Sequence, residues 1–430
     1  MNAIQSTDKP VIPSHIAQKL VTPSAYASSE IHEAYSWLRE NAPLAVASPV
    51  GFDPFWVVTK HEDILHISRN NDIFPSGARA TVLGPKDHID RVMHLTGGPN
   101  LVRTIIQMDG QDHRKYRNLT HSWFAPGSIR RRDNAISSLA EEAVQKLVKF
   151  GGNCDAVIDV GLEYPLRVVM DILGVPDEEM PRMLKLTQEL FGPQDPDNQR
   201  QDIDSCDQSY SASVRSAVSD FNEFFNNISI DRRENPRDDL ATLIANAEIN
   251  GEPIGEIEAA SYYMIVASAG HDTTSYSLAT GMWALATVPG LFRQLKERAE
   301  LIPQFIEEVI RWTSPVKTFM RSAREDVELR GQKIASGDWI ALCYASGNRD
   351  EEIFDRPFEF DINRKPNAQL SFGYGAHNCV GQHLARLELR RFFDVILRRL
   401  ESIELDGEPQ LTQSWFVNGF KSLPIRYVVA

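Results

Sequence analysis

A mainly α-helical fold with a minor β portion is what this sequence predicts. Three observations support it: a helical repeat of apolar residues runs through most of the chain, strand-like segments are few and short, and the composition supplies a large core. Of the 430 residues, 42% are hydrophobic and 24% are charged. A compact fold of this size hides roughly three quarters of its unfolded surface, so wholesale disorder is excluded.

In chain order, the first expected element is a β-hairpin over residues 43–59, where two apolar runs flank a Gly-Phe-Asp-Pro turn. Residues 133–150 predict an amphipathic helix, because apolar side chains recur on one face at helical spacing. Two further helices are expected over the apolar stretch 259–285 and over 382–399, which lacks proline and glycine. Beyond residue 325, the segments 327–329 and 339–344 predict short strands.

Two segments do not fit a regular element. Residues 74–107 are interrupted by prolines and glycines, and residues 193–211 are acidic, polar and nearly free of large apolar side chains. The second segment is either a domain linker or a lid, because long loops in compact enzymes are often functional. We favour a flexible lid, since the flanking helices read as parts of one helical body.

Charge and cysteine usage limit the class of protein. The formal net charge is 45 − 59 = −14, which argues against nucleic acid as a partner. Residues 1–10 show no cationic region followed by an apolar core, so we expect no secretory signal. His271 and Asp272 interrupt the apolar stretch 259–285, which therefore predicts a buried helix and no membrane span. Four widely spaced cysteines exclude a disulfide scaffold and suit the reducing cytoplasm.

The densest chemical signal is a cysteine in a glycine-rich frame, Phe372-Gly-Tyr-Gly-Ala-His-Asn-Cys-Val-Gly381. Three glycines within nine residues allow backbone shapes that other residues resist. Cys379 stands at or just before the N-terminus of the helix expected over 382–399. The helix dipole and free amides there favour the thiolate, which makes Cys379 a nucleophile or a metal ligand.

Several readings of Cys379 stay open on spacing alone. A phosphatase-type nucleophile needs His directly before the cysteine and Arg six positions after it, whereas His377 is two before and Arg386 seven after. A zinc site needs three further ligands, and only His377 and His383 are near in sequence. A buried cysteine in a tight turn is the remaining structural interpretation.

The pattern Phe-x-x-Gly-x-His-x-Cys-x-Gly resembles the haem-binding loop of cytochrome P450 enzymes. It falls on Phe372, Gly375, His377, Cys379 and Gly381. The resemblance implies that Cys379 is the axial ligand of the iron of haem b, that Phe372 shields the sulfur, and that His377 reaches a propionate. Gly373 and Gly381 would belong to the same cofactor-binding loop.

A second motif, Ala-Gly-His-Asp-Thr-Thr over residues 269–274, violates helix propensity inside the apolar helix. Glycine costs about 1 kcal/mol against alanine there, and such violations mark functional or strained sites. The Thr273 hydroxyl can bond the carbonyl of Ala269 and loosen the helix. A buried polar patch is the structural alternative.

As a set, this motif resembles the oxygen-activating helix of the same family. The resemblance implies that Asp272 and Thr273 form an acid–alcohol pair that supplies protons to the co-substrate dioxygen. Ala269 and Gly270 would leave room for oxygen and substrate. The haem would lie between this helix and the cysteine-bearing helix, in one α-rich domain spanning 1–430 with a small N-terminal β region.

Charged residues elsewhere complete the resemblance. Glu308 and Arg311 are three apart on one helical face, and the family pattern joins them with a third residue, expected here to be Arg349, behind the thiolate. Two propionates need cationic partners. The candidates that the resemblance supplies besides His377 are His113, Arg117 and Arg321.

The resemblance to soluble bacterial members, and within them to the α-terpineol-oxidising subgroup, implies a monooxygenase for a small apolar substrate, a monoterpenoid or an aromatic hydrocarbon. Electrons would come from NAD(P)H through a reductase and a [2Fe–2S] ferredoxin that docks on a basic patch. The patch candidates are Arg114, Lys115, Arg130, Arg131, Lys365 and Arg386. The expected substrate-pocket residues are Ala269, Thr273, Phe319, Phe416 and Val417. A peroxide-using haem–thiolate enzyme and a non-haem hydrolase built on Cys379 are the alternatives.

Overall fold

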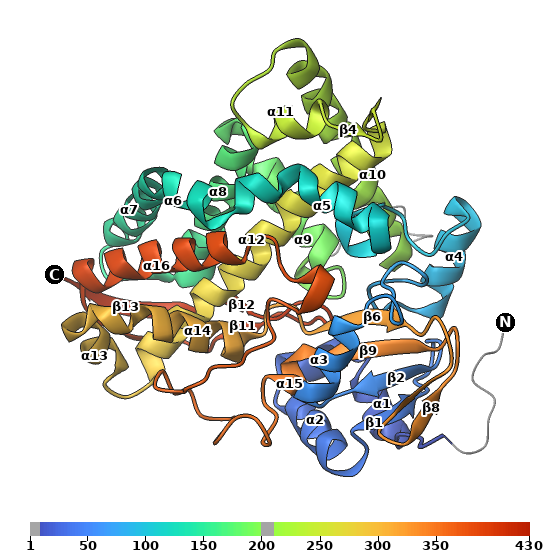
Figure 1. The fold of residues 1–430 in the computed structure, drawn as a ribbon. Coiled ribbons are helices and arrows are strands. Elements are labelled where there is room, and N and C mark those ends of the chain that lie inside the picture. The colour runs from blue at the N-terminus through green and yellow to red at the C-terminus, as the bar shows by residue number, and fades with distance from the viewer. Residues whose placement is uncertain (1–8, 199–209) are drawn as a thin grey trace.

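Helices dominate the computed structural model, which describes residues 9–198 and 210–430 (Figure 1). The α-helices are α1 (Ser14–Lys19), α2 (Glu30–Asn41), α3 (His61–Arg69), α4 (Lys86–Thr96), α5 (Gly110–Phe124), α6 (Pro126–Arg131), α7 (Asp133–Lys149), α8 (Glu163–Leu173), α9 (Met180–Phe191), α10 (Tyr210–Glu234), α11 (Leu240–Ala245), α12 (Glu256–Thr287), α13 (Leu291–Glu297), α14 (Ile302–Thr313), α15 (Tyr344–Gly347) and α16 (Gln382–Arg399). Short helical turns are η1 (Pro23–Ala27), η2 (Ile105–Gln107), η3 (Ala156–Gly161), η4 (Asp177–Glu179), η5 (Pro196–Asn198), η6 (Ala299–Leu301) and η7 (Gly375–His377).

The β portion is small, and its main sheet joins distant parts of the chain in the order β1-β2-β9-β6. Within it, β2 and β9 are parallel, while the outer pairs are antiparallel. A second sheet has the order β10-β13-β3, and three two-stranded ribbons complete the set. The strands are β1 (Leu44–Ala47), β2 (Phe55–Val58), β3 (Asn153–Asp155), β4 (Glu248–Ile249), β5 (Glu252–Pro253), β6 (Thr318–Ser322), β7 (Val327–Leu329), β8 (Gln332–Ile334), β9 (Trp339–Cys343), β10 (Leu400–Leu405), β11 (Gln410–Leu411), β12 (Phe420–Ser422) and β13 (Pro424–Val429).

The helix α12 runs through the middle of the helical part (Figure 1). It packs against α8, α9, α10, α14 and α16. Most of its side chains are buried all the way round, as expected of a helix in the centre of a large core. This central placement accounts for the long apolar stretch. Within the described ranges, no helix is long and apolar enough to cross a membrane.

Most expected elements are confirmed. The hairpin forms between β1 and β2, with Leu44 opposite Val58, and the helices expected over 133–150, 259–285 and 382–399 correspond to α7, α12 and α16. The strands expected over 327–329 and 339–344 correspond to β7 and β9.

The segment 74–107 contains an unpredicted helix, α4. It begins directly after Pro85 and ends at Gly97, whose φ of 70° is left-handed, so standard start and stop signals were present. Of the expected lid over 193–211, the part up to Asn198 forms a turn and η5. Residues 199–209 lie outside the described residues.

Candidate functional site

A large cavity lies between α12 and the loop that precedes α16. Most of its wall is apolar, and cationic side chains gather on part of it. Of the predicted site residues, those that line it are His113, Arg117, Ala269, Gly270, Thr273, Phe319, Arg321, Phe372, Gly373, His377, Cys379, Gly381 and Phe416. Segments more than 250 residues apart in the sequence are thus brought to one site.

The cysteine loop is held by its backbone. The N–H of Cys379 donates to the carbonyl of Phe372 at 2.8 Å, and η7 lies between these two residues. Gly375 has φ 70°, and a Cβ there would stand 2.1 Å from the carbonyl oxygen of Ser68. Glycine is therefore required at 375 both by conformation and by the close approach of α3. Gly381 has φ −82°, a backbone conformation that any residue can adopt. A Cβ at this position would meet no other atom of the chain within 4 Å.

The environment of the Cys379 thiol differs from the sequence expectation. Burial is the largest influence and raises its pKa. The backbone amides of Gly381 and Gln382 and the guanidinium groups of Arg117 and Arg386 act in the opposite direction. The helix N-terminus thus favours the thiolate as predicted, but burial outweighs it. A metal ion bound to the Cys379 sulfur would supply the missing stabilisation, because coordination deprotonates a thiol.

A cluster of cationic and basic side chains faces the cavity beside this loop. The rings of His113 and His377 lie 4.2 Å apart, and Arg321 is buried with one guanidinium hydrogen bond, to the carbonyl of Met320. The Nε2 atom of His113 is buried and has no hydrogen-bond partner among residues 9–198 and 210–430. Burial, together with His377 and Arg117, lowers the pKa of His113 to about 4.

These groups fit the two carboxylates of a haem. Burial lowers the pKa of His377 as well, although Asp109 opposes the shift from 3.8 Å. Packing basic groups together out of water is unfavourable unless an anion joins them. The orphaned Nε2 of His113 and the guanidinium of Arg321 are donors suited to such an anion.

On the opposite wall, α12 continues as a regular helix through the motif, so the expected loosening is not seen, but the expected side-chain bond is present. The Thr273 hydroxyl donates to the carbonyl of Ala269 at 2.8 Å, the bond predicted from the sequence. Gly270 lines the cavity, and its missing side chain also serves packing, because a Cβ would stand 2.8 Å from Val169 of α8.

Asp272 is fully buried beside this groove. Neither carboxylate oxygen has a hydrogen-bond donor within the described part of the chain, and burial raises its pKa. The nearest titratable group is His271, whose Nδ1 is 3.2 Å from Oδ1 of Asp272. The acid–alcohol pair therefore has one member on the cavity wall and one just behind it.

A second buried acid, Glu388 of α16, was missed. It lines the cavity, its Oε2 has no partner within the described part, and burial raises its pKa well above the usual range. The signal was available: Leu384, Glu388 and Phe392 follow one another at i, i+4 spacing, which places the acid on the apolar face of the helix.

The predicted charge network is confirmed for its first two members and corrected for the third. Arg311 and Glu308 are fully buried and form an ion pair at 2.7 Å. Arg364 supplies the second arginine, 3.5 Å from Glu308. Arg349, predicted for that place, instead donates to the carbonyl of Trp312 at 2.9 Å and lies over its ring. The carbonyl of the preceding residue, Asn348, accepts from Arg311, so Arg349 lies beside the pair, but its guanidinium turns to Trp312 and does not reach Glu308.

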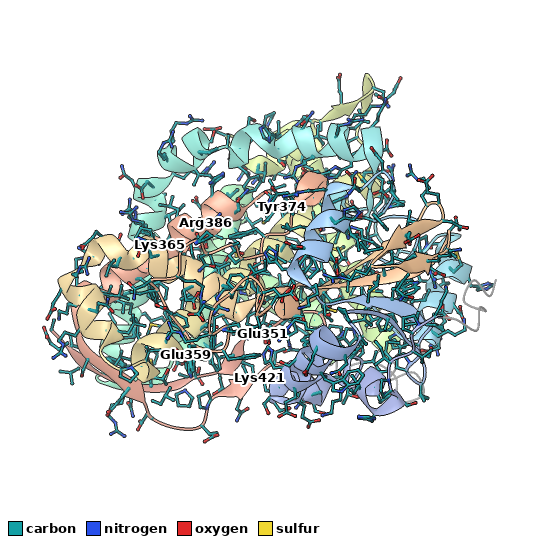
Figure 2. All side chains as sticks on the ribbon, turned by 60° about the horizontal axis from the view of Figure 1, so that its bottom comes forward. Glu351, Glu359, Lys365, Tyr374, Arg386 and Lys421 are labelled. Carbon is teal, nitrogen blue, oxygen red and sulfur yellow. The ribbon has the colours of Figure 1, made fainter. Side chains whose placement is uncertain are left out.

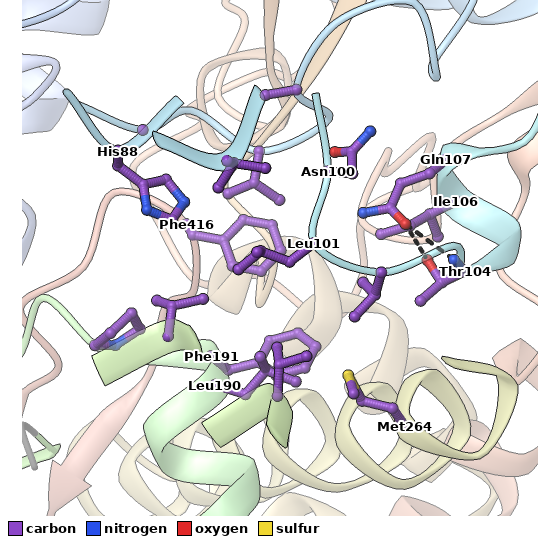
Figure 3. Close-up of a pocket in the computed structure, with 18 of the residues that line it drawn as sticks. His88, Asn100, Leu101, Thr104, Ile106, Gln107, Leu190, Phe191, Met264 and Phe416 are labelled. Carbon is purple, nitrogen blue, oxygen red and sulfur yellow. Dashed lines mark hydrogen bonds between the residues drawn. The ribbon is translucent and has the colours of Figure 1, made fainter. Parts of the chain in front are cut away.

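A second chamber adjoins the cavity (Figure 3). It is largely apolar and shares with the cavity the side chains of Ile106, Phe191, Ile265 and Phe416. Phe191 and Phe416 stack with their ring centroids 5.6 Å apart, so this pair stands between the two spaces. Phe191, which ends α9 just before the expected lid, was not among the predicted pocket residues.

Val417 is the one predicted pocket residue that the structure places elsewhere. It is fully buried in a hydrophobic cluster and forms a bridge with Val316, and neither chamber includes it. The chain bends at Trp415 and Phe416, where the N–H groups of Phe416 and Val417 donate to the Ser414 hydroxyl, and the bridge with Val316 then keeps Val417 in the core.

The candidates for the basic patch differ in their surroundings: one of them forms an ion pair, and the others are exposed to solvent. Lys365, Tyr374 and Arg386, labelled in Figure 2, come from the stretch of chain around Cys379. Arg386 is engaged: it pairs with Glu307 at 2.5 Å and lies over the Phe372 ring at 4.4 Å. It therefore supports the cysteine loop and is a poor free docking cation. The exposed candidates are Arg114, Lys115, Arg130, Arg131 and Lys365.

The structure also bears on the two alternatives for Cys379. In residues 9–198 and 210–430, no group of three or more His, Cys, Asp or Glu side chains is placed to hold a metal ion, so zinc finds no ligand set there. Arg386, the arginine nearest to the phosphatase pattern, is committed to Glu307. The cavity with its basic cluster instead matches the haem interpretation.

Comparison with known proteins identifies the family. The model of the cytochrome P450 family matches residues 26–427, and this chain therefore belongs to the cytochrome P450 family. Members are haem–iron monooxygenases that use dioxygen, which agrees with the cavity and its cysteine.

Three relatives illustrate the similarity. Cytochrome P450-terp of a Pseudomonas species is 42% identical over 97% of this chain and 99% of its own. A crystal structure of CYP108D1 from Novosphingobium aromaticivorans, also 42% identical, has a TM-score of 0.90 and covers 98% of this chain and 100% of that one. Linalool 8-monooxygenase of Pseudomonas putida is 29% identical over 94% of this chain and 98% of its own.

Proposed function

We propose that this protein is a ferredoxin-dependent haem–thiolate monooxygenase that hydroxylates a small apolar substrate, with a monoterpenoid as the first candidate. The observation that carries the proposal is one apolar cavity with Cys379 on one wall and the Asp272–Thr273 pair at the other. The relatives named for terpene chemistry support the substrate class.

Residues of this chain would hold the haem from three sides. The Sγ of Cys379 would bind the iron, with Phe372 and the Arg386 guanidinium stacked beside the loop. His113, Arg117, Arg321 and His377 would bind the propionates. When bound, the haem supplies an iron centre that binds dioxygen and accepts electrons.

The chain's own contribution to catalysis is proton supply and exclusion of water. Thr273 lines the cavity, and its hydroxyl, anchored on the Ala269 carbonyl, presents an oxygen there. Asp272, whose oxygens accept from no donor in the part of the chain that the structure describes, can take a proton from water and pass one on. The apolar walls exclude bulk water and orient a neutral substrate.

Electron supply separates this proposal from a peroxide-using enzyme. A peroxide-using enzyme has no need of the proton pair that Asp272 and Thr273 supply, so the pair favours dioxygen and electrons from NAD(P)H. A reductase and a [2Fe–2S] ferredoxin would deliver them, with docking on a basic patch that includes Arg114.

Sparse, widely spaced cysteines support a cytoplasmic location.

Reconstitution tests the proposed function. The holoenzyme is combined with a bacterial ferredoxin, its reductase and NAD(P)H, and monoterpenoids and small aromatic hydrocarbons are screened by spin-state shift and then by product analysis under ¹⁸O₂. We expect one ¹⁸O atom in a hydroxylated monoterpenoid. Turnover with peroxide alone, and none with the reduced ferredoxin, would contradict the proposal.

A further inference from the structure

The aromatic pair between the two chambers joins segments that are far apart in the sequence (Figure 3). Phe191 is the last residue of α9, and Phe416 lies in the loop between β11 and β12. Apolar contact has little directional preference, so the rings alone do not fix their own positions. The polar contacts of the two segments decide how firmly the pair is held.

The loop that carries Phe416 is held on one side by β6 and its approach. The N–H of Lys317 donates to the carbonyl of Phe416 at 2.8 Å, and its buried Nζ donates to the carbonyl of Ser414 at 2.8 Å. The Ser414 hydroxyl accepts the N–H groups of Phe416 and Val417 at 3.1 and 3.3 Å. This loop is therefore a fixed platform for the Phe416 ring.

The chain that follows Phe191 binds the same loop through two consecutive buried side chains. The Ser414 hydroxyl donates to the side-chain carbonyl of Gln194 at 2.8 Å, which uses its single hydrogen. The N–H of Gln413 donates to Oδ2 of Asp195 at 2.8 Å. We call Gln194, Asp195, Gln413 and Ser414 the clamp, because these bonds join the residues just after Phe191 to the residues just before Phe416.

The carboxylate of the clamp has every partner that a buried charge needs. Asp195 is fully buried, and its Oδ1 lies 3.0 Å from Nζ of Lys421 on β12 and accepts the N–H of Asp197 at 3.0 Å. Its own N–H donates to the carbonyl of Gly192, the residue after Phe191, at 3.0 Å. A satisfied buried network is rigid and costly to break, so the clamp holds the end of α9 through a single turn of chain.

We propose that Gln194 and Asp195 are positioning residues that limit the length of the substrate. By clamping the end of α9 to the Phe416 loop, they keep the two rings stacked and confine the substrate to the chamber that contains Cys379. The inference deepens the proposed function, on which it rests for a substrate of this compact kind. A chain that extends into the second chamber has to part the rings and strain the clamp.

Two ligands of different length test this on the holoenzyme. N-Butylimidazole and N-decylimidazole both bind haem iron through the imidazole nitrogen, and only the decyl chain is long enough to reach past the rings. Their dissociation constants are measured by the shift of the Soret band. In Gln194→Leu, which removes the bond from Ser414, we expect decyl binding to tighten relative to butyl binding by about two- to tenfold, the range that one net hydrogen bond allows.

A second variant guards against misfolding of the first. Asp195→Asn keeps the shape and an acceptor for the Gln413 N–H but removes the charge that binds Lys421, so it should shift the ratio in the same direction. An unchanged ratio in both variants would overturn the inference.

A double variant separates positioning of the rings from general softening. In the Phe416→Leu background no ring pair is left to position, so adding Gln194→Leu should change the ratio no further. The same added shift in that background would overturn the inference, because Gln194 would then act elsewhere.

The matched control is Asn246→Leu, whose side chain donates to the carbonyls of Arg232 and Thr242 outside both chambers. It should keep the wild-type ratio, and an equal shift there would overturn the inference. Ligand binding needs no electrons, dioxygen or turnover. Failure of the proposed function would therefore appear only in the reconstituted reaction, and failure of the clamp only in the ratio of dissociation constants.

Discussion

At two residues of this site, burial and neighbouring charges act on the pKa in opposite directions. Burial raises the pKa of Cys379 and Asp272, while their neighbours pull both pKa values down. On balance both pKa values stay raised, and such perturbed groups in a cavity are typical of functional sites.

The residue-scale prediction concerns Thr273. In Thr273→Ala the hydroxyl that faces the cavity is lost, so proton delivery slows and electrons are diverted to peroxide. Because positioned proton transfer contributes about 10²–10⁴-fold, we expect product per NAD(P)H to fall at least about tenfold while the haem spectrum is kept. The measurement is the ratio of product and hydrogen peroxide to NAD(P)H consumed.

A matched control is Thr287→Ala, an exposed threonine at the end of the same helix with the same kind of bond to the carbonyl four residues back. It should leave coupling unchanged. Equal coupling in wild type and Thr273→Ala would remove Thr273 from the proton path.

The residues that sequence reasoning found are those whose type breaks a local rule. Asp272 and Thr273 stand out in an apolar helix, and Cys379 stands out in a glycine frame. Arg364 and Glu388 were missed because charged residues are ordinary in their surroundings, and only burial in the folded chain reveals them. Burial depends on which elements pack together, which a single sequence does not state.

At the scale of elements, a buried ion pair ties α14 to the loops before Cys379. Arg311 donates to Glu308 and also to the carbonyls of Asn348 and Pro357. Removing one arm of a buried pair typically costs about 3–5 kcal/mol. We therefore expect Arg311→Ala to lower the free energy of unfolding by that amount and to yield haem-poor protein, measured by haem content and urea denaturation.

The control for this prediction is Arg298→Ala. Arg298 pairs with Glu300, but both side chains are more than half exposed, so its loss should cost under about 1 kcal/mol. Full haem loading and wild-type stability in Arg311→Ala would contradict the structural role.

The pair of Phe191 in α9 and Phe416 in the C-terminal segment sets the size of the passage between the two chambers. In Phe416→Leu, the stacked contact is lost, and the cavity should admit larger ligands. Since a methylene group in a pocket is worth about 1–3 kcal/mol, a terpenoid longer by one or two carbons should bind roughly tenfold tighter relative to wild type. Spin-state titration measures this ratio.

Phe221→Leu is the matched control, because Phe221 is equally buried but packs in the helical core outside both chambers. It should lower stability without changing ligand preference. An unchanged preference in Phe416→Leu would show that the passage is controlled elsewhere.

Three long helices were predicted closely: α7 from its periodicity, α12 from its apolar length and α16 from its lack of proline and glycine. The bounds of α7 and α16 were nearly exact, whereas α12 runs beyond the predicted 259–285 at both ends, over Glu256–Thr287. The helix α4 was not predicted, because prolines and glycines around it hid its short repeat, although Pro85 and Gly97 are the signals that begin and end it. Val417 and Phe416 differ by one position, and only the register of the folded segment decides which of them faces the cavity.

For the whole molecule, the family fold is confirmed, and the sheet that pairs β2 with β9 joins residues 55–58 to residues 339–343. Such distant pairing supports the single domain over 1–430, which stays a prediction. The lid over 193–211 stays one as well.

The proposed ferredoxin would dock on the surface of the molecule, so this prediction concerns an exposed charge. Arg114 is exposed on α5 one residue from His113, next to the cavity. Arg114→Glu should weaken ferredoxin-driven turnover, with a larger effect at low ionic strength, because exposed charges are screened within about 10 Å at 0.1 M salt. The measurement is the rate against ferredoxin concentration at two salt concentrations.

Arg237→Glu, an exposed arginine between α10 and α11, is the control and should leave ferredoxin-driven turnover at its wild-type rate. If the Arg114 variant behaves like the control, the docking surface lies on other residues.

The central claim is that Cys379 binds haem iron as a thiolate, and the absorption spectrum of the reduced protein under carbon monoxide tests it most directly. We expect a strongly red-shifted Soret band in the wild type and in Cys154→Ser and Cys343→Ser, and its loss in Cys379→Ser alone. A haem band without the red shift, or a red shift that survives in Cys379→Ser, would contradict the account.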